Sequence, residues 1–266
     1  MRVVVALIAA LCAPLGAAAQ MADAASLAAG ADVVILGEAH DNPDHHATQA
    51  AFVAEIAPTA VVFEMLDAAQ VEAISPASLT DEAALEAALG WDASGWPDFS
   101  MYYPIFEAAG DAAFYGAAVP RAEARASMSA GVVDAFGPEA GRFGLDTPLP
   151  APQQAAREAM QMAAHCDAMP EGMLPAMVDI QRLRDARLAQ VALTALGETG
   201  GPVVVITGNG HARADWGVPV YITQAAPEVS VFTLGQGEDG RRPPGAFDVV
   251  LNAPAPERPD PCLAFQ

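Results

Sequence analysis

The sequence predicts an α/β fold: a mostly parallel central sheet with helices on both faces and a helical insertion before the last strands. The main observation is that short runs rich in β-branched residues alternate with longer stretches of helical character. A chain that passes from strand to helix and back to strand favours parallel pairing. A second observation is that several of these runs end at glycine or a carboxylate, at the sheet edge where ligands bind.

The first strand-helix-strand unit lies before residue 75. The apolar run Val33–Leu36 predicts a short, buried strand. Asp41-Asn42-Pro43 predicts a turn, and we expect Asp44 to be the N-cap of a helix that reaches about Ala57. Ala60–Phe63 predicts a second strand, and Met65–Ile74 predicts a helix after it.

The stretch over residues 91–106 is unusually aromatic and is interrupted by Gly95, Pro97 and Pro104. Such a stretch does not form one regular element, and its rings must cover an apolar surface. Two interpretations stay open: the stretch folds over the core, or it forms a wall or lid for a flat apolar ligand. It holds six of the chain's 17 aromatic residues: Trp91, Trp96, Phe99, Tyr102, Tyr103 and Phe106.

The rest of the chain is expected to hold the insertion and the remaining strands. Ala112–Val119 predicts a third strand, and the helical pattern over about 122–198 is the insertion, because it separates two strands. Pro202–Thr207 is the clearest strand in the sequence. The pattern also predicts two short strands at Val218–Ile222 and Val229–Leu234.

We expect three parts: a signal peptide over residues 1–19, one α/β domain over 20–235 and a loosely attached tail over 236–266. The first part has one arginine, then an apolar run and Ala17-Ala18-Ala19, which is the layout of a signal peptide. It is too short for a stable membrane span, so we expect no transmembrane segment after its removal. The tail is rich in proline, glycine and charged residues, with Phe247–Leu251 as a candidate edge strand.

Cleavage after Ala19 and export to a bacterial periplasm are the expected fate of the chain. A lipid anchor on Cys12 is the alternative, but Leu11 occupies the position where a small residue is expected. After cleavage Cys166 and Cys262 remain, and an oxidising compartment permits a disulfide between them. The sequence leaves open whether they are joined or both free, and predicts that neither is a catalytic nucleophile.

The charge of the chain excludes some partners. Loss of Arg2 with the signal peptide leaves 11 of the 12 basic residues against 33 acidic ones, a net charge of −22. Nucleic acid and anionic membrane surfaces are therefore not expected to bind.

Ionisable side chains follow four of the expected strands where those strands end: Glu38 and His40, then Glu64, Arg121 and His211. Because parallel strands end at one edge of a sheet, we expect these side chains to converge. His40, Glu64 and His211 form a set suited to zinc or manganese with an open position for water. The five residues would then be catalytic in a metal-dependent hydrolase, with Arg121 holding an anionic intermediate. A metal-free, hydrogen-bonded site is the structural alternative.

Four further polar residues are candidates for supporting this site: His45, His46, Gln181 and Asp185. The last two interrupt the apolar stripe of a helix expected over about 173–196, and a buried carboxylate needs a partner. Either they pair with neighbouring arginines, or the stripe lies over the polar edge of the sheet.

The sequence resembles the ChaN-like family, haem-uptake proteins of the Tiki superfamily, from about Leu27 to Leu234. Its most specific feature is a pair of G-x-x-H motifs, each after a buried strand. The first is extended by an Asp-Asn-Pro turn and two histidines. The resemblance rests on Gly37-Glu38-Ala39-His40, Phe63-Glu64-Met65, Arg121, Gln181-x-x-Arg184-Asp185, Gly208-Asn209-Gly210-His211 and Gly217-Val218-Pro219.

Membership of this family implies an α/β fold, export, haem binding through a tyrosine and a homodimer. Several family members are lipoproteins, whereas this sequence lacks a convincing lipidation cysteine. Relatives in the wider superfamily are instead metal-dependent proteases or esterases built on the same two motifs.

A haem site needs one axial ligand, a flat apolar slot and partners for two propionates. Tyr102 and Tyr103 are the expected ligands because they lie in the aromatic stretch, and Arg121, Arg213 or the histidines are the expected propionate partners. Our first hypothesis is therefore haem or iron handling, with haem or another small apolar ligand as the partner. A metal-dependent hydrolase is the second hypothesis, and an inert interaction module is the third.

Overall fold

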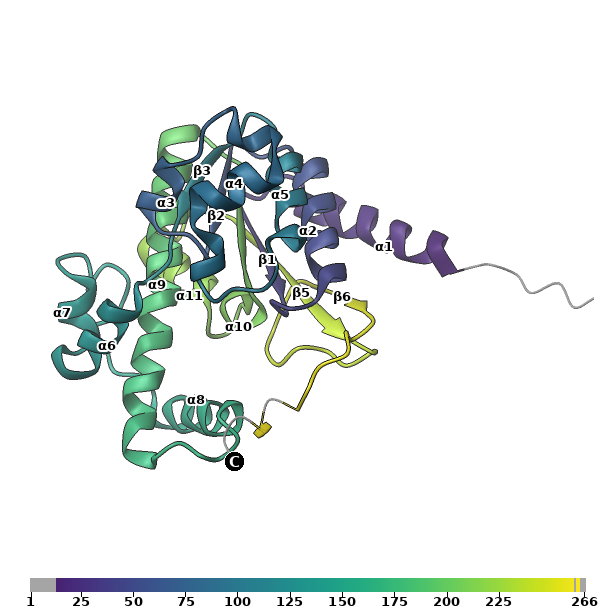
Figure 1. The fold of residues 1–266 in the computed structure, drawn as a ribbon. Helices are drawn as coiled ribbons and strands as arrows, with labels where there is room; N and C mark the ends of the chain where they lie inside the picture. Colours follow the sequence, from purple (N-terminus) through teal and green to yellow (C-terminus); the bar gives the residue numbers. More distant parts are fainter. Residues whose placement is uncertain (1–12, 261, 264–266) are drawn as a thin grey trace, which may run out of the picture.

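A computed structural model describes residues 13–260 and 262–263, with side chains described from residue 20 onward. Its centre is one sheet of six strands in the order β3-β2-β4-β1-β5-β6 (Figure 1). Neighbouring strands all pair in parallel, which confirms the expected α/β fold. The strands are β1 (Val33–Glu38), β2 (Ala60–Phe63), β3 (Ala113–Gly116), β4 (Val203–Gly208), β5 (Val231–Glu238) and β6 (Val249–Ala253).

Alternate residues of the central strands β1, β2 and β4 enter two separate apolar cores, one on each face of the sheet. Val34 and Leu36 of β1 belong to the first core, and Val33 and Ile35 belong to the second. All four side chains are fully buried, since helices cover both faces. The first face is covered by α1 (Ala13–Ala28), α2 (Pro43–Ile56), α4 (Glu82–Leu89) and α5 (Tyr103–Ala109). The second face is covered by α7 (Val132–Phe136), α9 (Leu174–Thr199) and α11 (Val218–Ala225).

The expected helical insertion lies between β3 and β4. It contains α6 (Arg121–Ala130), α7, α8 (Ala151–Ala164) and the long helix α9. Part of this insertion extends beyond the carboxyl ends of the strands, and α8 lies below them in Figure 1. The insertion therefore borders the sheet edge where the candidate functional residues gather.

Helix α2 begins two residues earlier than the sequence predicts. Asn42 is the N-cap rather than Asp44, because the Asn42 side chain accepts a hydrogen bond from the Asp44 backbone N–H at 3.0 Å. Pro43 occupies the first helical position, where its missing N–H costs nothing. After β2, the expected helix over Met65–Ile74 is reduced to a turn followed by α3 (Ala68–Glu72).

The prediction of a strand at Val218–Ile222 is wrong, since these residues begin α11. Pro219 lies in the first helical turn, and Val218, Tyr221 and Ile222 are buried at helical spacing. The sequence favoured a strand because three of these five residues are β-branched and the run is too short to show a helical period. The element that follows β4 directly is another short helix, α10 (Asn209–Ala212), which contains His211.

The segment after Gly235 pairs with the sheet and contacts the turn after β1. Strand β5 continues to Glu238, and β6 pairs with it in parallel. Arg258 then donates hydrogen bonds to the carboxylates of Asp41 and Glu238, at 2.6–2.7 Å. In Figure 1 the chain runs from β6 to the neighbourhood of α8.

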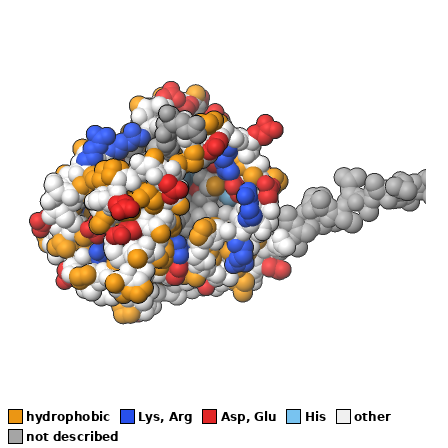
Figure 2. Space-filling view, turned by 90° about the horizontal axis from the view of Figure 1, so that it is seen from below, with side chains coloured by type: hydrophobic (Ala, Val, Ile, Leu, Met, Phe, Trp, Pro, Cys, Tyr) orange, Lys and Arg blue, Asp and Glu red, His pale blue; other side chains and the backbone are white. Residues whose placement is uncertain are grey.

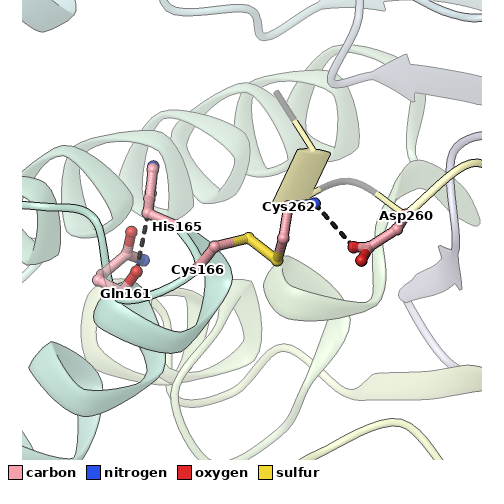
Figure 3. Close-up of a disulfide and its surroundings, with 5 residues drawn as sticks. All are labelled: Gln161, His165, Cys166, Asp260 and Cys262. Carbon is pink, nitrogen blue, oxygen red and sulfur yellow. Dashed lines mark hydrogen bonds between the residues drawn. A yellow bond between two sulfur atoms is a disulfide. The ribbon is translucent and has the colours of Figure 1, made fainter. Parts of the chain in front are cut away.

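A disulfide joins Cys166, just after α8, to Cys262 in this last segment (Figure 3). The two cysteines are 96 residues apart in the sequence. The Cys262 backbone N–H also donates to Oδ1 of Asp260 at 2.9 Å, which fixes the local turn. Of the two alternatives that the sequence left open for this pair, the structure has the joined one.

The expected signal peptide lies largely outside the described residues, which begin at Ala13, so Cys12 is not described. Helix α1 spans the expected cleavage site after Ala19. Within the described part of the chain, no helix combines the length and apolar character that a membrane crossing requires.

Candidate functional site

The carboxyl ends of β1, β2 and β4 lie side by side because β4 pairs with both other strands. In this register Phe63 is opposite Ile206, and Glu38 is opposite Gly208. The polar residues that follow these strands are therefore brought to one edge of the sheet. Figure 2 views the molecule from that side and shows a hollow with histidine atoms inside it.

Glu38, the last residue of β1, is the centre of the first group of side chains. Its Oε1 accepts hydrogen bonds from Nδ1 of His40 at 2.7 Å and from the Tyr102 hydroxyl at 2.9 Å. Its Oε2 lies 3.3 Å from Nδ1 of His46. Burial alone would raise the pKa of Glu38, but the two imidazoles outweigh it and lower the pKa to about 2. Glu38 is therefore a buried carboxylate that stays ionised.

His40 is the exposed member of this group, with 36% of its side chain accessible. Its ring meets the Trp96 ring edge-on, with centroids 4.8 Å apart. Nε2 of His40 lies over Gly208, where a Cβ atom would come within 2.9 Å of it. Burial lowers the pKa of His40, but the bond to Glu38 raises it more, so the net shift is upward.

Glu64 is the centre of the second group. Its Oε2 accepts hydrogen bonds from the Thr207 hydroxyl at 2.6 Å and from the Gly208 backbone N–H at 2.9 Å. Its Oε1 lies 3.5 Å from Nε2 of His211, whose Nδ1 donates to Asp185 at 2.6 Å. Burial alone would lower the pKa of His211, but Glu64 and Asp185 raise it to about 9. A protonated imidazole thus lies between two carboxylates.

The structure shows contacts for three of the four supporting residues. Asp185 contacts the site through a hydrogen bond with His211. His46 holds the turn after β1, since its Nε2 donates to the His40 carbonyl at 2.8 Å. His45 is fully buried and joins the Ala39 backbone N–H to the Gly237 carbonyl, which is a structural role. Gln181 lies half-buried one turn before Asp185 on α9.

A pocket of about 550 Å³ opens beside Glu64, and we call it the sheet-edge pocket. One wall is apolar, with Met65, Trp96, Val119 and Leu188 among its residues. Arg121 and Arg184 also line it, from α6 and α9. The Arg121 guanidinium reaches the opposite wall, since a methyl group on Gly95 would lie 3.1 Å from its Nη2 atom.

Neither arginine of the pocket forms an ion pair or a side-chain hydrogen bond with another described residue. Five other arginines do form ion pairs: Arg142, Arg182, Arg187, Arg213 and Arg258. The two arginines are therefore available to an anionic ligand, in a pocket whose lining also includes the carboxylates of Glu64 and Asp67.

The aromatic stretch mostly fills the core, as one of its two interpretations expected. Trp91, Phe99, Tyr102 and Phe106 are buried in the first apolar core. Trp96 is the exception because it is only partly buried and lines the sheet-edge pocket. The stretch therefore serves both as a core and as one wall of a pocket.

The two expected haem ligands are not at this pocket. Tyr102 is fully buried, and its hydroxyl donates to Glu38, so the surrounding side chains separate it from a porphyrin. Tyr103 donates to the Leu79 carbonyl at 3.3 Å and packs near Phe99, away from the pocket lining. This geometry gives no support to Tyr102 as a ligand.

The predicted zinc or manganese site is also not supported. No group of three or more histidine, cysteine, aspartate or glutamate residues in the described part of the chain is placed to hold a metal ion. The candidate residues form two groups instead: His40 with Glu38, and His211 with Asp185 and Glu64. Within each group the side chains are joined by hydrogen bonds.

Sequence reasoning missed Thr207 and the role of Arg184. Thr207 ends the clearest strand of the sequence, and its hydroxyl faces Glu64, but a threonine in a strand is too common to be a signal. Arg184 belongs to the quoted Gln181-x-x-Arg184-Asp185 motif, so its position next to Asp185 was the available signal.

Two solved structures and one family model are similar to this chain. The chain is similar to a solved structure described as "Cofacial heme binding to ChaN of Campylobacter jejuni". The alignment covers 86% of this chain and 90% of that chain, with a TM-score of 0.64 and 19% sequence identity. A likeness at this identity shows a shared fold. A second structure, the type III effector HopBA1, covers 88% of this chain and 91% of its own, with a TM-score of 0.47 and 12% identity. No curated protein matches.

The comparison with family models identifies the family, because it compares the amino-acid sequence rather than the fold alone. A family model described as "Haem-binding uptake, Tiki superfamily, ChaN" matches residues 24–222, which include both G-x-x-H motifs and the whole helical insertion. The match covers well over half of the chain. The chain therefore belongs to the ChaN family of haem-binding uptake proteins in the Tiki superfamily.

Proposed function

We propose that this protein is exported and binds haem in the sheet-edge pocket as part of haem or iron uptake. Family membership supports the haem and uptake parts of this proposal. The observation that carries the site is the combination of one apolar wall with two arginines that have no carboxylate partner. Haem has the matching chemistry, because it is a flat apolar ring with two carboxylates at one side.

The pocket has the size and chemistry that haem needs. Its volume of about 550 Å³ lies within the range of small-molecule sites. Trp96 and Val119 offer apolar contacts to the ring, and Arg121 and Arg184 offer charged hydrogen bonds to the propionates. When bound, haem would supply the redox-active iron, and the residues of the chain would hold and orient it.

A haem titration of the purified protein tests this proposal. We expect saturable binding of haemin, followed by the change in its absorption, and weaker binding of haemin dimethyl ester, which lacks charged carboxylates. Arg121→Gln and Arg184→Gln are each expected to weaken haemin binding about tenfold, which is about 1.4 kcal/mol. They are expected to leave binding of the ester unchanged.

Arg125→Gln is the matched control, because Arg125 is also exposed on α6 but does not line the pocket. It is expected to bind haemin as the wild type does. Absence of saturable haemin binding by the wild-type protein would contradict the proposed function. Equal losses in all three arginine variants would contradict the pocket as the site.

Two features support export, and the family supports pairing of two chains. Residues 1–19 have the layout of a signal peptide, and the Cys166–Cys262 disulfide suits an oxidising compartment.

The Campylobacter jejuni protein is described as binding haem cofacially. We extend the proposal to a homodimer in which the haem groups of two copies face each other. Sedimentation with and without haemin tests it, and a monomer under both conditions would contradict it.

A further inference from the structure

A second pocket, of about 210 Å³, shares no lining residue with the sheet-edge pocket, and we call it the arginine pocket. It is formed by the loop between α7 and α8, the first turn of α8, and parts of α9 and α11. Arg182 of α9 lines it, whereas Arg184 lines the sheet-edge pocket. The two arginines reach different pockets because residues two apart lie on nearly opposite sides of a helix.

Arg157 of α8 is a buried cation in this pocket. Only 5% of the residue is exposed, and its Nε atom has no hydrogen-bond partner among the described residues. Its Nη2 atom donates to the Trp216 carbonyl at 3.3 Å, and the guanidinium lies 5.1 Å from the centroid of the Trp216 ring. Asp185 acts on it only at longer range and is hydrogen-bonded to His211. Because a buried charge without a close counter-charge is costly, Arg157 is available to an anion that enters the pocket.

Arg182 is the second buried cation of the pocket. It is 5% exposed, and its Nη2 atom donates to the carbonyls of Gly144, Leu145 and Thr147 at 2.9–3.4 Å, which holds the loop that forms one wall. Its Nη1 atom lies 3.3 Å from Oδ1 of Asp179, whose side chain is 39% exposed. Its Nε atom has no partner in the described part of the chain. Because water screens an exposed carboxylate, Arg182 keeps much of its positive field toward the pocket.

Tyr221, which also lines the pocket, shows that both positive charges act at one place. Burial raises the pKa of Tyr221 to about 12, with a smaller rise from Asp185, while Arg182 and Arg157 both act to lower it. Both guanidinium groups therefore lie near the Tyr221 hydroxyl. A ligand beside this hydroxyl meets the field of both arginines.

The rest of the lining also favours an anion. The chain has 33 acidic residues and 12 basic ones, yet the lining contains two arginines and no aspartate or glutamate. Helix α8 begins beside the pocket, with Pro150 as its N-cap and Gln153 in its first turn, and this turn carries no acidic residue. The positive end of the helix dipole adds to the field of the arginines.

The apolar part of the lining narrows the class of ligand. Phe143, Leu149 and Val220 line the same pocket as the arginines. A planar carboxylate matches the fork of a guanidinium group, and an apolar body attached to that carboxylate matches these side chains. The volume of about 210 Å³ is below the range of sites for drug-sized molecules, so the ligand must be small.

We propose that the arginine pocket binds a small organic carboxylate, with Arg157 and Arg182 meeting its charge and the apolar side chains contacting its body. The inference goes beyond the proposed haem function and does not depend on it, because the two pockets share no lining residue. It gives the helical insertion, which supplies both arginines, a binding role of its own.

Benzoate is the probe for this site, because it is a small carboxylate with an apolar ring. We expect isothermal titration calorimetry of the purified protein, in a phosphate-free buffer, to show saturable binding of benzoate at one site per chain. Benzamide has the same shape without the charge and is expected to bind about tenfold more weakly or less. Inorganic phosphate is also expected to bind more weakly than benzoate, since it has no apolar part.

Arg157→Gln is expected to weaken benzoate binding about tenfold and to bind haemin as the wild type does. Gln224→Glu is the second variant. Gln224 lines the pocket but is exposed, so the added carboxylate repels benzoate without disturbing the core. Thr223→Glu is its matched control, because it places the same charge at the neighbouring exposed position of α11, outside the pocket lining. It is expected to retain most of the wild-type affinity for benzoate.

Equal binding of benzoate and benzamide, or wild-type benzoate affinity in Gln224→Glu, would overturn the inference. If circular dichroism shows that Arg157→Gln does not fold, the two glutamate variants decide the question. Binding of phosphate without binding of benzoate would overturn the assignment to an organic carboxylate. A protein that binds haemin but not benzoate would refute this inference and leave the proposed function standing. A protein that binds benzoate but not haemin would do the reverse.

Discussion

His211 donates its Nδ1 hydrogen to Oδ1 of Asp185 over 2.6 Å, although the two residues lie on different helices, α10 and α9. This contact ties the helical insertion to the carboxyl end of β4. Glu64 approaches the other side of the same ring, with 3.5 Å between its Oε1 and Nε2 of His211. The buried imidazole therefore links three segments that are far apart in the sequence.

This arrangement predicts that the protein becomes less stable as the pH rises from about 6.5 to 9. A histidine with a raised pKa stabilises the fold fully below its unfolded pKa of 6.5, and the stabilisation is lost as the pH passes its folded pKa of about 9. At about 1.4 kcal/mol per pKa unit, the contribution is on the order of 3 kcal/mol. Urea unfolding at about pH 6, 8 and 10 measures it.

His211→Gln is expected to have a smaller decrease in unfolding free energy over this pH range than the wild type. His165→Gln, which changes a histidine outside the site, is expected to retain the wild-type decrease. Parallel pH profiles for the wild type and His211→Gln would show that the carboxylates do not raise the pKa of His211.

Tyr102→Phe is expected to destabilise the fold by about 1–3 kcal/mol, because it removes a hydrogen bond donor from the buried Glu38 carboxylate. The ring contacts with His46 and Trp91 are retained in phenylalanine. Tyr103→Phe is the comparison, since its hydroxyl makes only a 3.3 Å bond to a carbonyl. Thermal or urea unfolding of both variants measures the difference, and equal stabilities would count against the role given to Tyr102.

Loss of the disulfide is expected to cost about 2–5 kcal/mol, because Cys166 and Cys262 close a long loop in the unfolded chain. The double variant Cys166→Ser with Cys262→Ser is expected to melt at a lower temperature and to be insensitive to reductant. Its haemin affinity, measured well below the melting temperature, is expected to be unchanged, since neither cysteine lines the sheet-edge pocket. A loss of haemin binding by the folded variant would contradict the prediction that haemin binding does not depend on the disulfide.

Export predicts a mature N-terminus at Gln20. Intact-mass measurement of the protein purified from its native host is expected to give the mass of residues 20–266 with two hydrogens lost to the disulfide. A diacylglycerol on Cys12 would instead support a lipid anchor, and an unprocessed chain in the cytoplasm would argue against export.

The strands and the sheet edge were predictable because β-branched runs that end in glycine or a carboxylate are distinctive. Val33–Leu36 and Pro202–Thr207 were placed nearly as they fold, and the convergence of His40, Glu64 and His211 followed from parallel pairing. Helix α11 was predicted as a strand because five residues are too few to distinguish a hydrophobic period of 2 residues from one of 3.6 residues.

The sequence pattern could not predict the direction in which individual side chains point. Tyr102 and Tyr103 are neighbours in the chain, yet one faces Glu38 in the core and the other faces the Leu79 carbonyl. That division arises from the tight turn over Phe99–Met101, which directs Tyr102 inward just before α5. Likewise, Arg184 joins Arg121 in one pocket only because α6 and α9 pack together.

The position of β1 in the sheet also affects how the chain is made. Val33 pairs with Val203 on one side and with Val231 on the other, so β1 has no partner strand until those segments leave the ribosome. Long-range pairing of this kind slows folding, because distant segments must meet before any ladder forms. A nascent chain with this topology keeps its central strand unpaired for most of its synthesis, which suits passage through a narrow translocation channel in an unfolded form.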